Sequence, residues 1–214
     1  MSHKVHPTIY RLRDLKDWSS RWLDKKRFLH YLEEDFKIRE YLEKKVKKLS
    51  VEKIEIERFP DKTVIIIYSA RPGLIIGRSG AGIEEFKKQI KKKILKNKIK
   101  TEVKLEVKEI KNPWSSAVLS AQWIAQQIEK RANHKKTLKW ALEKIMALKE
   151  NKGARVEISG RLGGAEMSRR EWLSRGNLPR QTIRAIIDYA EERAYCTYGV
   201  IGIKVWIYKG EKFD

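Results

Sequence analysis

The stretch Leu74-Ile75-Ile76-Gly77-Arg78-Ser79-Gly80 decides how this sequence folds, because it sets a glycine-bounded turn after a short apolar run. Glycine has no Cβ and tolerates positive φ, so a Gly-x-x-Gly turn can bring backbone N–H groups against nucleotide phosphates. An ordinary tight turn can contain the same two glycines. The rest of the chain therefore has to decide between a plain turn and a phosphate-binding loop.

The composition favours a polyanionic partner. The 214 residues include 49 lysines and arginines against 28 aspartates and glutamates, which gives a formal net charge of +21. A field of this size attracts nucleic acid at a distance, and each neutralised phosphate releases condensed counterions. The sequence therefore predicts a protein that binds nucleic acid.

The chain is also expected to be cytoplasmic, with no membrane partner. No apolar run approaches the ~18 residues that a spanning helix needs, and Met1-Ser2-His3-Lys4 leads into no signal-type apolar core. Cys196 is the only cysteine, so the chain has no internal disulfide and fits a reducing compartment.

Residues 1–37 mix basic and aromatic side chains and are predicted to form a basic N-terminal extension. The aromatic rings could stack on bases, although packing onto the chain's own domain explains the same pattern. The aromatic members are Tyr10, Trp18, Trp22, Phe28, Tyr31 and Phe36, and the basic members are Arg11, Arg13, Lys16, Arg21, Lys25, Lys26 and Arg27.

Hydrophobic periodicity predicts a regular order of elements around the glycine loop. They are a helix at 35–49, antiparallel strands at 51–58 and 63–68 joined at Pro60-Asp61, a short helix before the loop, a helix lined by Ile83, Phe86, Ile90 and Ile94, and a strand at 103–107. A helix-first order with the Gly-x-x-Gly turn between two helices resembles the type II KH fold. Residues 38–109 are therefore expected to be a type II KH RNA-binding domain with helices on one face of its sheet.

Residues 110–214 are predicted to form a second domain, which makes the whole chain α+β. A boundary is expected at Asn112-Pro113, where Asn can cap a helix and Pro can take its first position. Two helices are expected, lined by Ala117, Ala121, Ile124 and Ile128 and by Leu138, Leu142, Ile145 and Leu148, and packed on a sheet with strands at 154–158 and 201–207. The pattern does not place the strands between Met167 and Thr197.

A second glycine-bearing segment, Ser159–Glu166, comes before a run of arginines. Neither glycine segment contains the Gly-Lys-Ser/Thr of a triphosphate-binding loop, so this segment is interpreted as a glycine-permitted bend. The basic arm that follows it suits phosphate contacts, and its arginines are Arg169, Arg170, Arg175 and Arg180.

No pattern in the sequence indicates catalysis, a metal or a cofactor. The acidic groups Glu33-Glu34-Asp35 and Asp188, Glu191 and Glu192 are interpreted as surface acids rather than as a metal site. The four histidines lack metal-ligand spacing. Trp123, Trp140 and Trp206 lie in regular elements and are expected to pack or to rim an RNA contact. The chain is therefore predicted not to be an enzyme.

Four segments together resemble the bacterial small-subunit ribosomal protein S3 family over almost the whole chain. They are Lys4-Val5-His6-Pro7, Ala70-Arg71-Pro72-Gly73-Leu74-Ile75-Ile76-Gly77-Arg78, Ser159-Gly160-Arg161-Leu162-Gly163-Gly164-Ala165-Glu166 and Thr197-Tyr198-Gly199-Val200-Ile201-Gly202-Ile203-Lys204-Val205-Trp206-Ile207. The resemblance implies a structural protein of the small-subunit head that contacts small-subunit ribosomal RNA and neighbouring head proteins. It also implies that the chain lines the tunnel through which messenger RNA (mRNA) enters and helps to unwind it.

The resemblance assigns roles to particular residues. The family's basic cluster at the tunnel corresponds to His134-Lys135-Lys136-Thr137-Leu138-Lys139, so Lys135, Lys136 and Lys139 are expected to face mRNA. Lysine in place of arginine loses bidentate phosphate contacts and keeps the charge, and Ser79 replaces the lysine usual in the glycine loop. The RNA-binding residues expected elsewhere are Arg71, Gly77, Arg78, Ser79, Gly80, Lys87, Lys88, Lys91, Arg161, Arg169, Arg170, Arg175 and Arg180.

Two hypotheses stay open at this point: a ribosomal structural protein and a free KH-domain regulator of RNA. Cosedimentation with the small subunit in high salt distinguishes them. The lysines of residues 133–139 also fit a merely solvated helix face, since Lys135 and Lys139 are one turn apart with Lys136 beside them.

Overall fold

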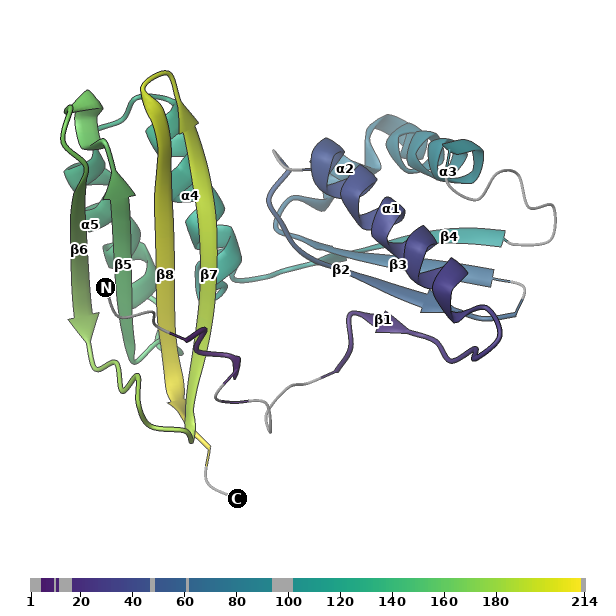
Figure 1. The fold of residues 1–214 in the computed structure, drawn as a ribbon, viewed down its shortest axis with the longest axis horizontal. Coiled ribbons are helices and arrows are strands. Elements are labelled where there is room, and N and C mark those ends of the chain that lie inside the picture. The colour runs from purple at the N-terminus through teal and green to yellow at the C-terminus, as the bar shows by residue number, and fades with distance from the viewer. Residues whose placement is uncertain are drawn as a thin grey trace. The chain divides into compact units, whose positions relative to one another are not determined.

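The computed structural model describes residues 5–9, 11, 17–46, 49–60, 62–93 and 102–212. The chain forms two compact units, one of residues 17–111 and one of residues 112–214 together with the first 16 (Figure 1). No helix of the described residues is long and apolar enough to cross a bilayer. Several residues named above lie outside the described ranges: Met1, Ser2, His3, Lys4, Tyr10, Arg13, Lys16, Asp61 and Ile94.

The unit of residues 17–111 has helices on one face of a four-stranded sheet (Figure 1). Its elements are β1 Ser20–Arg21, α1 Phe28–Val46, β2 Val51–Arg58, β3 Lys62–Ser69, α2 Pro72–Ile76, a 3₁₀ turn Arg78–Gly80, α3 Ala81–Lys93 and β4 Glu102–Glu109. The strand order is β1-β2-β3-β4, with β2 and β3 antiparallel and β3 and β4 parallel. This order confirms the predicted sequence of elements and adds strand β1, which pairs parallel with β2.

The core of this unit comes from residues at helical and strand spacing. The members buried between helices and sheet include Ile38, Leu42, Ile54, Ile56, Ile65, Ile67, Ile90, Val103 and Leu105. The β-branched run of β3 is buried throughout, which is why the alternation seen in β2 is absent there. Burial of this apolar face gives the unit its driving force.

Helix α1 begins at Phe28, before the start predicted at Asp35, so it takes in part of the segment that is predicted to be an extension. The carboxylate of Asp24 accepts the backbone N–H groups of Lys26 at 2.9 Å and Arg27 at 3.2 Å, which turns the chain into the helix. The first turns carry exposed apolar residues instead of an amphipathic pattern, and periodicity therefore misses them; Phe28, Leu29, Leu32 and Phe36 are all more than half exposed.

Glu34 and Asp35 belong to a buried ion-pair cluster, which corrects the surface interpretation for these two residues, whereas Glu33 is exposed as predicted. Glu34 and Asp35 are 4% and 3% exposed, and Arg58 of β2 binds both, at 2.7 Å and 2.5 Å. The indole N–H of Trp22 donates to the other Asp35 oxygen at 2.8 Å. Trp22 thus packs within its own unit, and the carboxylates are buried because Arg58 compensates their charge.

The second unit has two helices on one face of a four-stranded antiparallel sheet (Figure 1). Its elements are a 3₁₀ turn Pro113–Ser115, α4 Ala117–Glu129, α5 His134–Met146, β5 Gly153–Gly160, a 3₁₀ turn Leu162–Gly164, β6 Arg169–Gly176, β7 Ala185–Cys196 and β8 Gly199–Glu211. The strand order β6-β5-β8-β7 leaves β6 at one edge. The helices bury Ile124, Ile128, Leu138 and Ile145 against Val156, Ile158, Ile203 and Val205, as the sequence predicted.

The start of α4 differs from the expectation at Asn112-Pro113. Pro113 opens only a 3₁₀ turn, the Asn112 side chain makes no cap, and the helix begins at Ala117. The carboxylate of Asp188 on β7 accepts the Ala117 N–H at 2.8 Å, which satisfies one free donor at the positive helix end. Asp188 is therefore a helix cap and not a surface acid.

The first residues of the chain pack on the second unit. Arg11 is only 6% exposed. Its guanidinium donates to the carbonyls of Ala185 at 2.6 Å, Thr182 at 2.8 Å and Arg180 at 3.1 Å. The His6 ring lies edge-on to Tyr189, with centroids 4.6 Å apart. These contacts involve β7 and the segment before it, where the purple end of the ribbon crosses the sheet (Figure 1).

Candidate RNA-binding surfaces

The glycine loop of the first unit is a tight connection between α2 and α3. Gly77 has φ +72° and ψ −178°, a conformation that side chains rarely adopt, and its N–H donates to Gly73 O at 3.0 Å. A Cβ on Gly82 would meet Ile75 O at 2.6 Å, so the two helices approach too closely for any side chain there. The loop shape thus depends on Gly82 as well, which the sequence analysis did not single out.

The side chains of the loop and of α3 leave a basic surface in solvent. Arg78 and Ser79 are exposed, and Ser79 has φ +50°. Ile83, Phe86 and Ile90 turn toward the core and leave the lysines between them outside. The predicted contact residues in this group are Arg71, Lys88 and Lys91, which are exposed, and Lys87, which is half-buried.

Helix α5 carries the three lysines expected to face mRNA. Asn133 caps the helix, its side chain accepting the Lys135 N–H at 3.0 Å, so Lys135 and Lys136 lie in the first turn and Lys139 one turn later. All three are exposed, while Leu138 between them is 2% exposed and anchors the helix. The lysine side chains therefore add charge to the surface and do not pack in the core.

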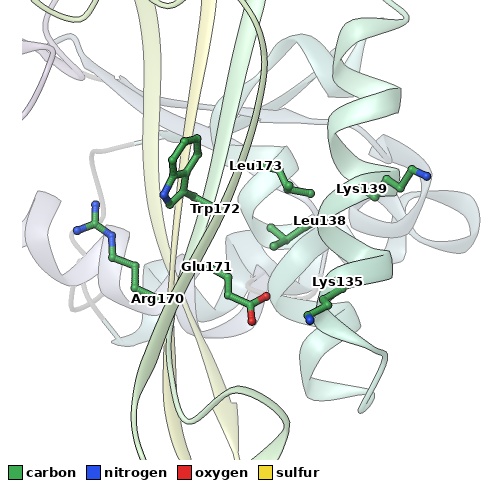
Figure 2. A pocket seen from close by; sticks show the side chains of 7 residues that line it. All are labelled: Lys135, Leu138, Lys139, Arg170, Glu171, Trp172 and Leu173. Atoms are coloured by element: carbon green, nitrogen blue, oxygen red, sulfur yellow. The ribbon is translucent and has the colours of Figure 1, made fainter.

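A pocket of about 530 Å³ lies between α5 and the edge strand β6. It is lined by Lys135, Leu138, Lys139, Arg170, Glu171, Trp172 and Leu173. Figure 2 shows Glu171 and Leu173 pointing toward α5, whereas Arg170 and Trp172 point to the other side of β6. The pocket brings the α5 lysines next to the basic arm, and β6 separates two basic surfaces.

The arginines of the second unit serve different purposes. Arg161 donates to the carbonyls of Ala165 at 3.0 Å and Tyr198 at 3.2 Å, so it holds the turn that follows β5. Gly163 at the turn has φ +68°, which supports the interpretation of this segment as a glycine-permitted bend. Arg169 and Arg175 are exposed and share the side of β6 on which Glu171 and Leu173 lie, because side chains two residues apart share a face.

Arg170 belongs to an ion-pair network on the sheet face opposite the helices. Its Nε lies 2.6 Å from Glu157 Oε1 and its Nη2 2.8 Å from Glu157 Oε2, while Arg155 Nη2 lies 2.9 Å from the same Oε2. Burial by itself would raise the pKa of Glu157, but the hydrogen bonds from Arg170 and Arg155 lower it below its ordinary value. Glu157 therefore stays ionised and holds both arginines.

The sequence analysis missed Arg155, Glu157 and Trp172. Arg155 and Glu157 alternate with the apolar residues Ala154, Val156 and Ile158, a signal of a charged second sheet face that was available. Trp172 lies in β6, an exposed edge strand without apolar alternation.

The tryptophans expected in regular elements make packing contacts within the second unit, although Trp140 is 41% exposed. Trp114, Trp123 and Trp140 form one cluster, in which the Trp123 and Trp140 rings stack with centroids 4.4 Å apart. Trp206 is 6% exposed. Among the described residues, no group of histidine, cysteine, aspartate and glutamate is arranged to hold a metal ion.

Comparison with known proteins covers both units. Residues 37–115 match the KH domain family, and residues 124–207 match the family described as ribosomal protein S3, C-terminal domain. The chain is 46% identical over 214 residues to small ribosomal subunit protein uS3 of Pelagibacter ubique, covering 100% of this chain and 92% of that relative. Identity to the uS3 proteins of Caldicellulosiruptor saccharolyticus and Persephonella marina is 45% and 42% over 213 residues, covering 99% of this chain and 93% and 92% of the relatives.

Proposed function

Because the chain belongs to the small ribosomal subunit protein uS3 family, we infer that it is an RNA-binding structural component of the small ribosomal subunit in the cytoplasm. Its ribosomal RNA partner follows from the KH domain and from the family. The relatives are ribosomal structural proteins, which agrees with the sequence prediction that the chain is not an enzyme. A free KH regulator is not favoured, since the match extends over both units rather than over the KH domain alone.

The proposal extends to the path of mRNA. Lys135, Lys136 and Lys139 face mRNA as it enters, and they hold separated strands by charge. The observation that carries this role is the first two turns of α5, where three exposed lysines stand on a helix anchored by the buried Leu138. Charges so placed can contact phosphates while the helix keeps its packing.

The remaining RNA contacts are proposed to divide between the two units. In the KH domain of residues 38–109 they come from the loop Gly77–Gly80, from Arg71 and from Lys87, Lys88 and Lys91. In residues 110–214 they come from Arg169, Arg170, Arg175 and Arg180, which contact ribosomal RNA or neighbouring head proteins. Arg161 contributes less, because two of its donors already serve backbone carbonyls.

The mRNA role is tested by Lys135→Ala, Lys136→Ala and Lys139→Ala in one chain. Alanine keeps helix propensity high and leaves Leu138 in place, so subunits should assemble normally. Translation through a stable hairpin placed just downstream of the ribosome should slow, and translation of an unstructured message should not. Equal slowing on both messages, or on neither, contradicts the proposed role.

A further inference from the structure

The sheet face opposite the helices carries an unbalanced set of charges. Arg155 and Arg170 share the carboxylate of Glu157, whose two oxygens accept three hydrogen bonds from them. Glu157 and Arg155 are 5% and 8% exposed, so this network is largely removed from water. Lys204 and Glu191 form a separate pair at 3.2 Å on the neighbouring strands.

Arg180 comes from the segment between β6 and β7 and reaches this face beside Trp206, and no carboxylate pairs with it in the described part of the chain. Its guanidinium lies 5.9 Å from the centre of the Trp206 ring. Burial and then the charge of Arg155 lower the pKa of Arg180, whereas Glu157 opposes them by less. The buried Nε of Arg155 also lacks a hydrogen-bond partner among the described residues. Arg180 therefore offers donors and positive charge that a bound anion would satisfy, whereas the Nε of Arg155 is covered.

Trp172 provides a flat apolar surface beside these donors. The Arg155 guanidinium lies 3.9 Å from the centre of its ring, so it covers one face of the indole. Trp172 is nevertheless 50% exposed, which leaves the other face for a ligand. Glu157, two residues along β5, holds the Arg155 guanidinium at 2.9 Å, and this guanidinium in turn supports the indole.

We propose that Trp172, Arg170 and Arg180 form a binding site for one nucleotide of single-stranded RNA, with the base stacked on Trp172 and its phosphate held by the arginines. The inference rests on the proposed RNA-binding function and adds the chemistry of one site. A nucleotide fits better than an acidic peptide, because a planar base uses the exposed indole face and a phosphate can bind the guanidinium of Arg180, with which no carboxylate of the described residues pairs. The site lies across β6 from the α5 lysines and is separate from them (Figure 2).

The fluorine NMR resonance of a labelled Trp172 reports binding at this site directly. The full chain is labelled with 5-fluorotryptophan, the Trp172 fluorine resonance is assigned with Trp172→Phe, and an adenosine trinucleotide is titrated in. The resonance should shift in a saturable way, and Arg180→Gln should weaken the apparent affinity roughly tenfold. The Arg11 segment binds the Arg180 carbonyl and not its side chain, so this variant should keep the fold.

Matched variants and ligands separate the outcomes. Lys149→Gln removes one exposed positive charge of the second unit, at a position that is given no RNA contact, and should change the affinity little. An abasic trinucleotide should bind more weakly, since stacking on an aromatic ring contributes a several-fold effect per base. Equal binding of the abasic ligand, no shift with RNA, or a shift only with an oligoglutamate peptide would each overturn the proposal. None of these results depends on the hairpin experiment.

Discussion

The glycine loop and the α5–β6 surface are both basic, but they depend on different parts of the chain. The α5–β6 surface consists of the exposed residues Lys135, Lys136 and Lys139 of α5 and Arg169 and Arg175 on the same side of β6. The loop depends on backbone conformation: Gly77 requires positive φ, and Gly82 allows α2 and α3 to approach. The α5–β6 surface depends on side chains that stand on a packed helix and an edge strand, and its backbone is regular. A single added methyl group should therefore damage the first surface, whereas the second should tolerate substitution and respond only to charge.

The largest effect is expected from Gly82→Ala. Its Cβ would lie 2.6 Å from Ile75 O and 3.0 Å from Ile76 O, so the helices must separate and the loop must change shape. Overpacking of this kind costs about 1–3 kcal/mol of unfolding free energy, which denaturant unfolding of the full chain would measure. Gly73→Ala is the matched control, because nothing lies within 4 Å of its added Cβ; an equal loss in both variants would contradict the role given to close helix approach.

A second expected effect is on RNA affinity without a loss of fold. Arg78→Asp with Ser79→Asp keeps both glycines and places carboxylates where phosphate would approach. Asp tolerates the positive φ of residue 79, so the unfolding free energy should change little. Binding of a single-stranded RNA, measured by fluorescence anisotropy, should weaken by about tenfold or more. Unchanged affinity with an intact circular dichroism spectrum would mean that the loop is a plain turn.

The α5 surface should show its charge in the salt dependence of binding. Each single-strand phosphate contact contributes roughly −0.7 to the slope of log binding constant against log salt concentration. The triple lysine variant should therefore make this slope less steep by about 2. Titrations of single-stranded RNA between ~50 and ~200 mM salt would measure it. Lys111→Ala with Lys149→Ala removes exposed charge elsewhere. If the salt dependence of RNA binding became as much less steep in this control as in the triple lysine variant, only the net charge would matter and not its place on α5.

The smallest effect concerns the Glu157 network, on the sheet face opposite the α5–β6 surface. The pKa of Glu157 is lowered in the folded protein, so its stabilising effect is present above the ordinary value of 4.5 and is lost as pH falls through the folded pKa. Thermal unfolding of the second unit should therefore become easier below about pH 4.5. Glu157→Gln should flatten this part of the profile. An unchanged profile in that variant would assign the acid sensitivity to other carboxylates.

The sequence predicted what periodic burial and special glycines determine. Ile83, Phe86 and Ile90 gave α3, and Gly77 with Gly80 gave the loop between two helices. It missed elements whose residues are not buried in a regular pattern. Strand β6 is exposed at every residue except the half-buried Glu171, and β7 is interrupted by an irregularity between Ile186 and Ile187. The pairing of Glu157 with two arginines also escaped, since it depends on a strand register that composition does not contain.

The attachment of the first residues to the second unit has a consequence for the order of synthesis. Arg11 is made early, while its acceptors at Thr182 and Ala185 follow 171 and 174 residues later. A buried guanidinium needs those carbonyls as hydrogen-bond acceptors. The N-terminal residues therefore cannot adopt their native contacts until nearly the whole protein has been translated. Residues 17–111, by contrast, hold all the strands of their own sheet and can fold as soon as they emerge. Completion of the second unit is thus a late event, in which the earliest residues meet some of the last.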